Sequence, residues 1–323
     1  MCASAPDSDL DHAPATEHYC TLFDRHFLPQ GLALHESLMQ QDPSCVLWVL
    51  CVDEETYESL GRLSLPELRR VRLESVESGD VIATRDTRSL GEYCWTLTSV
   101  FIAYLIEHHD EIARVTYVDA DCYFFSSPRR ILGELNAAGK DILITPHAYT
   151  PGYDLSEESG VYCVQFLTFS RSEAALEILR QWRSQCIDWC FARSELGRFG
   201  DQKYLDPWPE LHPDTVHVLA DAHLTMAPWN VERFKHHLDD LCMYHFHKFR
   251  LLGPGRVMLF EGFKVNHTVV ATVYGPYVDA VARVLALLGG SWNAYLPEPA
   301  PSLGGRISRL ILRAKGTRRT ARC

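Results

Sequence analysis

The sequence predicts an α/β fold of the doubly wound type, with a mixed, mainly parallel sheet flanked by helices. Apolar runs of strand length alternate with helical patterns along most of the 323 residues. The run Cys45–Val52 is apolar throughout, which is typical of a strand buried on both faces of a parallel sheet. Polar residues directly follow several of these runs. In sheets of this type, ligands bind beyond the carboxyl ends of the strands.

The N-terminal half of the chain supplies the first strands and helices. Residues 1–17 are polar and rich in Pro, Ser and Asp, which predicts a flexible arm. Leu32, Leu34 and Leu38 mark a helical pattern after the first strand. From the same reasoning we expect strands at Tyr19–Phe23, Cys45–Val52, Val71–Val76 and Arg114–Val118, and helical segments at Glu55–Arg62, Leu65–Arg70 and Thr96–His109.

The C-terminal half continues the alternation. The pattern Ser170-x-x-Glu173 is that of a capping box, which predicts that a helix begins there. We expect one domain over residues 18–290, then a Pro-rich linker and a basic tail over residues 291–323. The other elements expected are strands at Asp141–Pro146, Val161–Phe169, Val216–Ala220 and Met243–His247, a loop at Gly197–Pro209 and a helix at Tyr277–Leu288.

Composition and charge exclude some classes of function. The formal net charge is −11, and Arg306 to Cys323 contains seven Lys or Arg and no Asp or Glu, so the rest of the chain is more acidic still. An acidic body argues against nucleic-acid binding. The N-terminus lacks the basic and apolar regions of a signal peptide, and no continuous apolar run approaches the roughly 20 residues of a membrane span.

The eleven cysteines indicate a reducing compartment. Their number is odd, there is no CxxC motif, and many lie inside apolar runs, which favours free buried thiols over a disulfide framework. We therefore expect a cytoplasmic protein. Cys186 and Cys190 share a helix face and have the spacing of zinc ligands, but packing is the favoured interpretation because no second pair is evident.

Asp119 and Asp121 are the candidate metal ligands. They follow the strand Arg114–Val118, and on an extended chain residues i and i+2 point to the same side. A hard cation such as Mn²⁺ or Mg²⁺ prefers oxygen ligands and leaves positions open for phosphate oxygens. Two solvated loop carboxylates are the alternative, since a lone DxD motif is common. The position of the pair at the end of a buried strand favours the metal.

The segment Tyr117–Ser126 resembles the DxD segment of GT-A nucleotide-diphospho-sugar transferases. The nearest group is glycosyltransferase family 8, with glycogenin and the lipopolysaccharide galactosyltransferases, and the chain also resembles uncharacterised bacterial transferase-like proteins. The likeness runs over most of residues 19–288. It is carried by the opening strand and by the segments Glu92–Thr96, Gly200–Gln202, Ala227–Asn230 and His245–Lys248.

The resemblance implies a metal-dependent glycosyltransferase that uses a nucleotide-sugar donor, with UDP-sugars expected and retention of configuration. In the family, a late His joins the two DxD carboxylates on Mn²⁺, and His245 matches that ligand, with His247 as the fallback. Lys248 stands where relatives usually have Gly. Asp201 and Gln202 match the Asp-Gln pair near the reacting sugar; an N-cap role for Asp201 is the alternative.

The resemblance also implies a binding region for the donor nucleotide. Arg is well suited to phosphate, because its planar donors bind two oxygens together. Solvated loop charges are the alternative for the two arginines, and Phe23 is also a natural core residue. The donor-binding residues implied in this way are Thr21, Phe23, Asp53, Arg85, Arg88, Tyr93, Thr96 and Lys248.

One departure from the family pattern bears on the acceptor. Relatives often show Tyr-Asn-x-Gly, where this chain has Tyr162-Cys163-Val164-Gln165. A Gly there lets the backbone approach a sugar closely, whereas Gln165 offers hydrogen bonds to hydroxyls instead. A nucleotide-sugar-binding protein with impaired turnover is therefore one alternative function. Another is a haloacid-dehalogenase-like phosphohydrolase, for which Asp239 and Asp240 would supply the later acidic pair.

The C-terminal tail predicts contact with a membrane surface. Over residues 303–319, apolar positions at helical spacing are surrounded by basic ones, as in an amphipathic helix that binds anionic lipid. A saccharide or lipid-linked acceptor would suit such a helix, and a disordered solubilising tail is the alternative. The residues of the stripe are Leu303, Ile307, Leu310, Ile311 and Ala314, with Arg306, Arg309, Arg313 and Lys315 around it.

Overall fold

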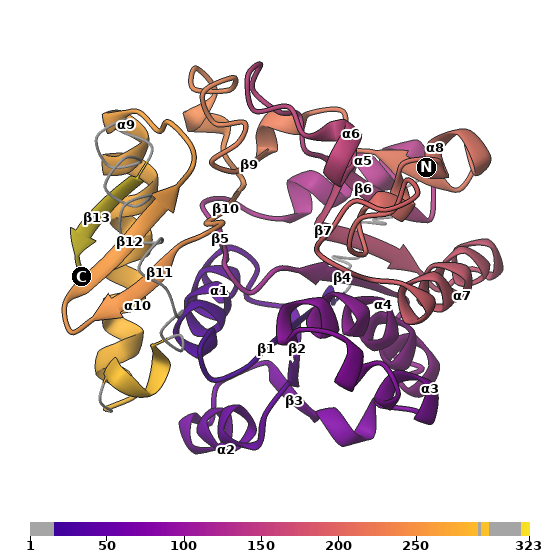
Figure 1. The fold of residues 1–323 in the computed structure, drawn as a ribbon, viewed down its shortest axis with the longest axis horizontal. Helices are drawn as coiled ribbons and strands as arrows, with labels where there is room; N and C mark the ends of the chain where they lie inside the picture. Colours follow the sequence, from indigo (N-terminus) through magenta and orange to yellow (C-terminus); the bar gives the residue numbers. More distant parts are fainter. Residues whose placement is uncertain (1–15, 290–291, 297–317) are drawn as a thin grey trace, which may run out of the picture.

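The computed structural model describes residues 16–289, 292–296 and 318–323. A seven-stranded sheet runs through the middle of the molecule in the order β3-β2-β1-β4-β7-β6-β8 (Figure 1). All neighbouring pairs are parallel except those that involve β7, which is antiparallel to β4 and to β6. The strands are β1 His18–Phe23, β2 Val46–Cys51, β3 Leu68–Arg72, β4 Arg114–Val118, β6 Ile142–Pro146, β7 Tyr162–Ser170 and β8 Val216–Val218. The predicted mixed, mainly parallel sheet is confirmed.

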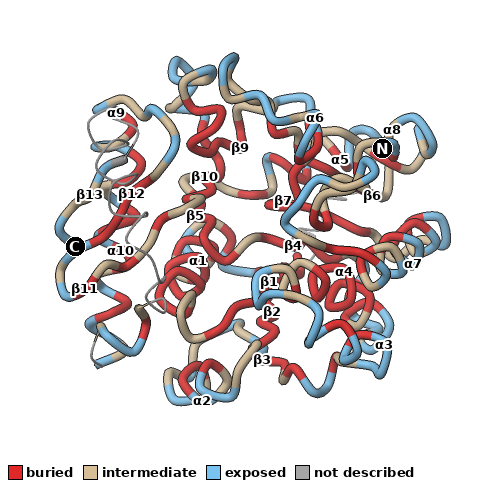
Figure 2. The backbone as a smooth tube through the Cα atoms, viewed as in Figure 1, coloured by how far each residue is buried: buried red, intermediate tan, exposed pale blue. Residues whose placement is uncertain are grey.

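Alternate residues of the central strands enter two separate hydrophobic cores. In β2, Leu47, Val49 and Cys51 point into one core, and Val46, Trp48 and Leu50 point into the other, as the two-residue period of a strand requires. Figure 2 shows the central strands as buried along their length, with exposed residues mainly on outer helices and loops. Both faces of the sheet are covered, so polar side chains reach solvent mainly where strands end.

Helices cover the two faces of the sheet. One core contains residues of α1, α5 and α10, and the other contains residues of α4 and α7. Shorter helices and 3-10 turns lie in the connections. The helices are α1 Leu28–Gln41, α2 Glu54–Leu63, α3 Gly79–Ile82, α4 Leu90–His108, α5 Arg129–Ala138, α6 Ser156–Ser159, α7 Glu173–Asp188, α8 Trp208–Leu211, α9 His267–Val269 and α10 Gly275–Leu287.

Two three-stranded sheets lie beside the main one. In the first, β10 (Met243–His245) is antiparallel to β5 (Cys122–Phe124) and parallel to β9 (Thr225–Met226). In the second, β12 (Arg256–Glu261) pairs antiparallel with β11 (Arg250–Gly253) and with β13 (Arg318–Arg322). Figure 1 shows β11, β12 and β13 beside α10 at one side of the molecule. The first small sheet joins the end of β4 to a segment more than a hundred residues later.

Two expected elements near residue 70 were wrong. The strand begins at Leu68 and ends at Arg72, and Leu73–Ser75 form a 3-10 turn, so neither the helix at Leu65–Arg70 nor the strand at Val71–Val76 is present. β3 is an edge strand of the sheet, and Arg69 and Arg70 are exposed. An edge strand with a polar face lacks the continuous apolar run by which the buried strands were recognised.

The expected helix starts were also wrong. The α4 helix begins at Leu90 and not at Thr96, because Ser89 and Glu92 form a full capping box. The α7 helix is capped by Ser172, whose side chain accepts from the Ala175 amide, so Ser170 is not the cap. Ser170 instead ends β7, where its amide donates to the carbonyl of Asp141.

The C-terminal part contains one long apolar helical stretch. His267–Leu287 runs through α9, a π-helical turn and α10, and it is long and apolar enough to span a bilayer. Half of its most apolar window is buried inside the molecule, and α10 packs against α1. The predicted amphipathic helix of residues 303–319 lies outside the described residues up to residue 317, and Arg318 and Arg319 belong to β13.

Candidate functional site

Asp119 and Asp121 lie in a tight turn between β4 and β5. The amide of Asp119 still donates to the carbonyl of Gln165 on β7 at 3.2 Å, which continues the ladder past the end of β4. The amide of Cys122 then donates to the carbonyl of Asp119 at 3.0 Å, so the chain turns at once into β5. The two carboxylates therefore converge because of a turn, and not because of the extended geometry that the sequence suggested.

The small sheet brings His245 to the same turn. His245 pairs with Cys122 in the antiparallel register of β5 and β10, and the amide of Phe246 donates to the carbonyl of Asp121 at 2.8 Å. Oxygen or nitrogen atoms of Asp119, Asp121 and His245 all lie within 4.8 Å of one another. Nε2 of His245 is 3.1 Å from Oδ1 of Asp121, and Nδ1 is 3.8 Å from Oδ2 of Asp119. The structure thus brings the three predicted ligands together.

The charges of this group are strongly coupled. Contact with Asp121 raises the pKa of His245 although burial opposes it, and contact with His245 lowers the pKa of Asp121 to about 2 against its own burial. Burial and the neighbouring Asp121 raise the pKa of Asp119, which His245 partly offsets. Without a cation, a proton on His245 balances part of the carboxylate charge. A divalent ion would take the place of that proton.

Gln165 holds the imidazole of His245 in position. Gln165 is fully buried on β7, and its Oε1 lies 3.0 Å from Nδ1 of His245. An amide oxygen only accepts, so Nδ1 must carry the hydrogen, which leaves Nε2 to face Asp121. Metal-binding histidines are commonly oriented by such a partner. Gln165 therefore positions the ring of His245. The departure from the family motif had suggested a different role, in which Gln165 faces a hydroxyl of the acceptor.

The donor set fits a divalent cation. Two carboxylates from the β4–β5 turn and one imidazole from β10 converge here. The imidazole is that of His245, and its other nitrogen, Nδ1, is already hydrogen-bonded to Gln165. Mn²⁺ and Mg²⁺ favour carboxylate oxygens, and Mn²⁺ also accepts imidazole. The residues present are thus suited to hold the ion that the sequence predicted.

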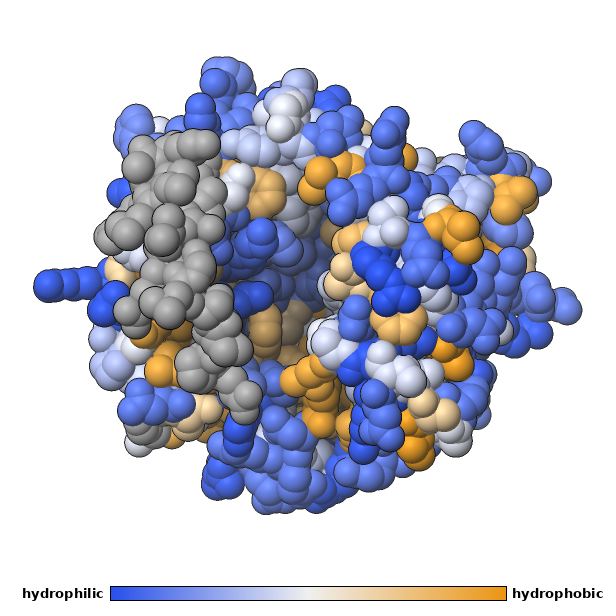
Figure 3. Space-filling view, in the orientation of Figure 1, coloured by the Kyte–Doolittle hydropathy of each residue, from blue (hydrophilic) through white to orange (hydrophobic). Residues whose placement is uncertain are grey.

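A cavity of ≈280 Å³ opens beside these ligands. Figure 3, in the orientation of Figure 1, shows a hollow over the middle of the molecule. Aromatic rings and polar groups alternate along the cavity wall, a combination typical of small-ligand sites. The lining residues are Trp95, Asp119, His147, Tyr149, Leu155, Ser159, Cys163, Val164, Phe199, Gly200, Asp201, Gln202, Trp229, His245, His247 and Phe263.

Asp201 and Gln202, the predicted pair near the reacting sugar, both lie in the wall of this cavity. Asp201 is 5% exposed, and burial together with the charge of Asp119 raises its pKa to about 8. The side chain of Gln202 donates to the carbonyl of Ser159 at 2.6 Å. The 3-10 turn at Lys203 begins after Gln202 without a side-chain cap, so the alternative role of Asp201 as an N-cap is not observed.

The segment Ala227–Asn230 supports the far wall of the cavity. Nε1 of Trp229 and Nδ2 of Asn230 both donate to the carbonyl of His147 at 3.0 Å. The ring of His147 stacks on Tyr149 with centroids 4.7 Å apart, and burial lowers the pKa of His147 to about 3. Sequence reasoning missed the aromatic lining, although Trp229 stood in a segment that carried the resemblance.

His247 and Lys248 directly follow β10. His247 lines the cavity, and burial lowers its pKa to about 3. Lys248 has a φ of +64°, the left-handed conformation that favours glycine, which accounts for the glycine that relatives carry at this position. Its Nζ lies 5.9 Å from the ring centre of Phe263, another lining residue.

The predicted arginines do not reach the metal ligands. Arg85 pairs with Glu77, which also accepts from the hydroxyl of Tyr93. Arg88 donates to the side chain of Thr96 and to the carbonyl of Ile187 at the end of α7. These four predicted donor-binding residues are thus engaged with the protein around α4, and in this conformation none of them lines the cavity.

The remaining predicted residues lie at the ends of β1 and β2. Phe23 is 3% exposed and packs over Gly31 of α1, which makes it a core residue. Asp53 caps α2 through the amide of Thr56 at 2.7 Å and accepts from the amide of Arg25. The hydroxyl of Thr21 is buried without a partner. Asp53 also borders a separate open pocket of ≈320 Å³ with Asp24, Arg25, His26 and Leu90.

Comparison with known proteins identifies relatives of unassigned function. No family model matches the chain. The uncharacterized protein YfnD of Bacillus subtilis (strain 168) is 28% identical over 282 residues, which cover 83% of this chain and 90% of YfnD. The uncharacterized protein YfnF of the same strain is 26% identical over 297 residues, which cover 87% of this chain and 97% of YfnF.

Solved structures of glycosyltransferases share the architecture. An active-site mutant of LgtC superposes with a TM-score of 0.51 at 12% identity, over 82% of this chain and 95% of LgtC. The bifunctional glycosyltransferase WbbM superposes with the same TM-score and identity, over 87% of this chain and 51% of WbbM. The mixed seven-stranded sheet and its flanking helices are therefore those of the GT-A glycosyltransferase fold.

Proposed function

We propose that this protein is a metal-dependent glycosyltransferase that moves a sugar from a nucleotide-diphosphate sugar to an acceptor. The proposal rests mainly on the convergence of Asp119, Asp121 and His245 beside the cavity of ≈280 Å³. The shared fold of LgtC and WbbM supports this reaction class. UDP-sugars are the first donors to test, with retention of configuration expected. The acceptor would be a saccharide or a lipid-linked sugar.

Some residues of the site would bind the metal ion, and others would position its ligands or contact the sugar. Asp119, Asp121 and His245 would hold Mn²⁺ or Mg²⁺, which when bound neutralises charge on the departing nucleoside diphosphate. Gln165 keeps Nε2 of His245 directed at the ligand group. Asp201 lies in the wall beside Asp119, where its carboxyl group would contact the donor sugar and, in its ionised form, would stabilise positive charge that develops at the anomeric carbon.

The aromatic wall suits a sugar ring. Trp229, Tyr149 and Phe263 line the cavity together with the polar groups of Asp201 and Gln202. Sugars present apolar C–H faces and polar edges, so a wall of rings with a few fixed hydrogen-bonding groups orients them and keeps water away. The pocket at Asp53 lies at the carboxyl ends of β1 and β2, which is where a nucleotide would extend in a sheet of this type.

The test combines ligand binding with turnover. The melting temperature of the full chain is measured with UDP and UDP-sugars, with and without Mn²⁺, because a ligand that prefers the native state raises it. We expect stabilisation by UDP only when Mn²⁺ is present, and its loss in Asp119→Asn. Release of UDP from UDP-sugars should also be lost in this variant. Full turnover by Asp119→Asn would overturn the proposal.

The same assays separate the alternatives. Binding of a nucleotide sugar without release of UDP or transfer would identify the impaired binding protein. Release of phosphate from phosphomonoesters would instead indicate a phosphohydrolase. The structure offers no support for the latter, because Asp240 belongs to a group with His223 and His237 that is separate from Asp119 and Asp121.

A further inference from the structure

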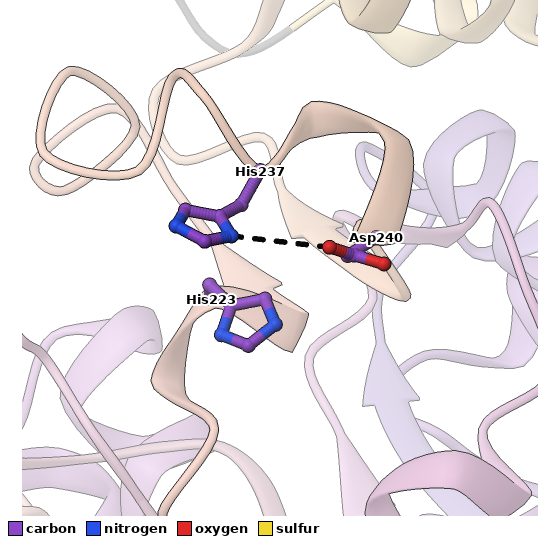
Figure 4. A group of neighbouring side chains, drawn as sticks. All are labelled: His223, His237 and Asp240. Carbon is purple, nitrogen blue, oxygen red and sulfur yellow. Dashed lines mark ion pairs between the residues drawn. The ribbon is translucent and has the colours of Figure 1, made fainter.

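A second group of metal-binding side chains lies away from the cavity. Among the described residues, His223, His237 and Asp240 offer ligand atoms that all lie within 4.8 Å of one another. His237 and Asp240 are exposed and His223 is half-buried. Figure 4 shows the three side chains gathered from two separate turns of the chain, with His237 directed towards Asp240. None of the three lines the cavity of the proposed active site.

Strand pairing brings the two turns together. His223 lies in the 3-10 turn Ala222–Leu224 directly before β9, and Asp240 lies in the 3-10 turn Leu238–Asp240 shortly before β10. β9 and β10 are parallel neighbours, and the amide of Cys242 donates to the carbonyl of Leu224 at 3.0 Å. The two turns are therefore held side by side at the same end of the two strands.

The local geometry sets the ligands at suitable separations. The amide of Asp240 donates to the carbonyl of His237 at 3.0 Å, which places the two side chains on one side of the turn. Nδ1 of His237 lies 3.8 Å from Oδ2 of Asp240, and the ring centres of His223 and His237 are 4.8 Å apart. The other oxygen of Asp240 lies 3.8 Å from a guanidinium nitrogen of Arg130, and Oδ2 is the oxygen nearer to His237.

We propose that His223, His237 and Asp240 bind Zn²⁺ and thereby clamp the turns that precede β9 and β10. Two imidazoles and one carboxylate are a donor set for zinc, whereas Mg²⁺ and Mn²⁺ favour oxygen-rich sites. The exposed side of the group leaves a fourth position for water. Because β10 ends at His245, the clamp would fix the strand that carries a ligand of the active site. The proposal does not depend on the reaction proposed above.

The test measures zinc binding on the full chain after removal of metal with a chelator. Asp119→Asn serves as the background, so that the first group of ligands is weakened. We expect about one Zn²⁺ per chain by calorimetry, with affinity at least about tenfold weaker in His223→Gln and in His237→Gln. Zn²⁺ should raise the melting temperature of the background protein and fail to do so in these two variants.

His236→Gln is the matched control, because His236 is an exposed neighbour in the same loop that is outside the group. It should bind Zn²⁺ as the background protein does. Unchanged binding in both His223→Gln and His237→Gln would overturn the proposal. Equal loss in His236→Gln would also overturn it, since that result indicates loose chelation by surface histidines. Far-UV circular dichroism identifies any variant that fails to fold, and Asp240→Asn then replaces it.

Discussion

Gln165 stands where relatives carry a different motif, and its contact with His245 gives that difference a physical meaning. The pair is buried, and an amide oxygen on Nδ1 fixes which nitrogen of the ring is free. The change from the family pattern thus falls on a residue that positions a metal ligand. The amide nitrogen of Gln165 is buried without a partner in the described structure. The contact with His245 is therefore made while another polar group of the same side chain stays unsatisfied, which is unfavourable.

We expect Gln165→Leu to weaken Mn²⁺ binding by about 10- to 100-fold, the usual effect of removing a partner that orients a ligand. Calorimetry with Mn²⁺ measures the change. Gln165→Glu is the matched variant, because it keeps an oxygen for Nδ1–H and should retain most of the affinity. Equal affinity in the Leu variant and the original protein would show that His245 needs no such partner.

The buried carboxyl group of Asp201 lowers the stability of the folded protein. Its pKa of about 8 exceeds that of an unfolded Asp, because burial and the charge of Asp119 disfavour the carboxylate. Between the two pKa values the folded state holds a proton that the unfolded state has lost, so this group lowers the free energy of unfolding as the pH rises from about 4 to 8. Below pH 4 both states are protonated and the penalty disappears.

Asp201→Asn should therefore raise stability at pH 8 by at least about 1 kcal/mol, since each unit of pKa shift is worth about 1.4 kcal/mol. Urea unfolding in a metal-free buffer at pH 5 and pH 8 checks the sign, and the gain should be larger at pH 8. Sugar transfer at pH 8, where part of the Asp201 carboxyl is ionised, should fall in the same variant. A variant that is less stable at pH 8 would contradict the assigned cause.

At the scale of elements, two identical patterns had opposite outcomes. Ser-x-x-Glu occurs at Ser89 and at Ser170, and only the first forms a capping box. The second Ser is held in β7 by its hydrogen bond to Asp141, so a strand register decides the matter and Ser172 becomes the cap. A local pattern cannot report a contact with a distant strand, which is why the start of α7 was misplaced, whereas the start of α4 was marked by the local pattern at Ser89 and was missed.

Substitution of the two serines tests this assignment. Ser172→Ala removes the acceptor for the Ala175 amide and should lower the free energy of unfolding by about 1 kcal/mol. Ser170→Ala is the control and should change it by less than about 0.5 kcal/mol. Urea unfolding of both variants gives the comparison. A larger loss in Ser170→Ala would mean that the cap lies where the sequence pattern put it.

At the site, the sequence could predict features that show a local pattern and could not predict those that depend on contacts between distant segments. The buried strands β1, β2 and β4 and the pair Asp119 and Asp121 were visible because apolar runs end at polar residues. His245 was found only through the resemblance, since nothing local shows that β10 pairs with β5. The aromatic wall and the engagement of Arg88 with Thr96 depend on contacts between distant segments, and the sequence carries no local sign of them.

At the scale of the whole molecule, the last described residues close the sheet that follows the site. β13 pairs with β12 over Arg256–Glu261, and the amide of Cys323 donates to the carbonyl of Gly255 at 3.2 Å. The thiol of Cys323 also donates to the carbonyl of Val278 in α10 at 3.4 Å. Residues 318–323 thereby join β12, which leads to the cavity residue Phe263, to a helix that packs on α1.

Ala321→Pro tests how much the molecule depends on this closure. Ala321 lies opposite Val257 in β12, and a proline inside a strand removes a hydrogen-bond donor and disturbs the ladder. We expect a loss of about 1 kcal/mol or more in the free energy of unfolding, together with faster amide exchange along β12. Ala321→Val, a good strand former, should keep both properties. Unchanged exchange in β12 of the proline variant would show that β13 contributes nothing to the sheet.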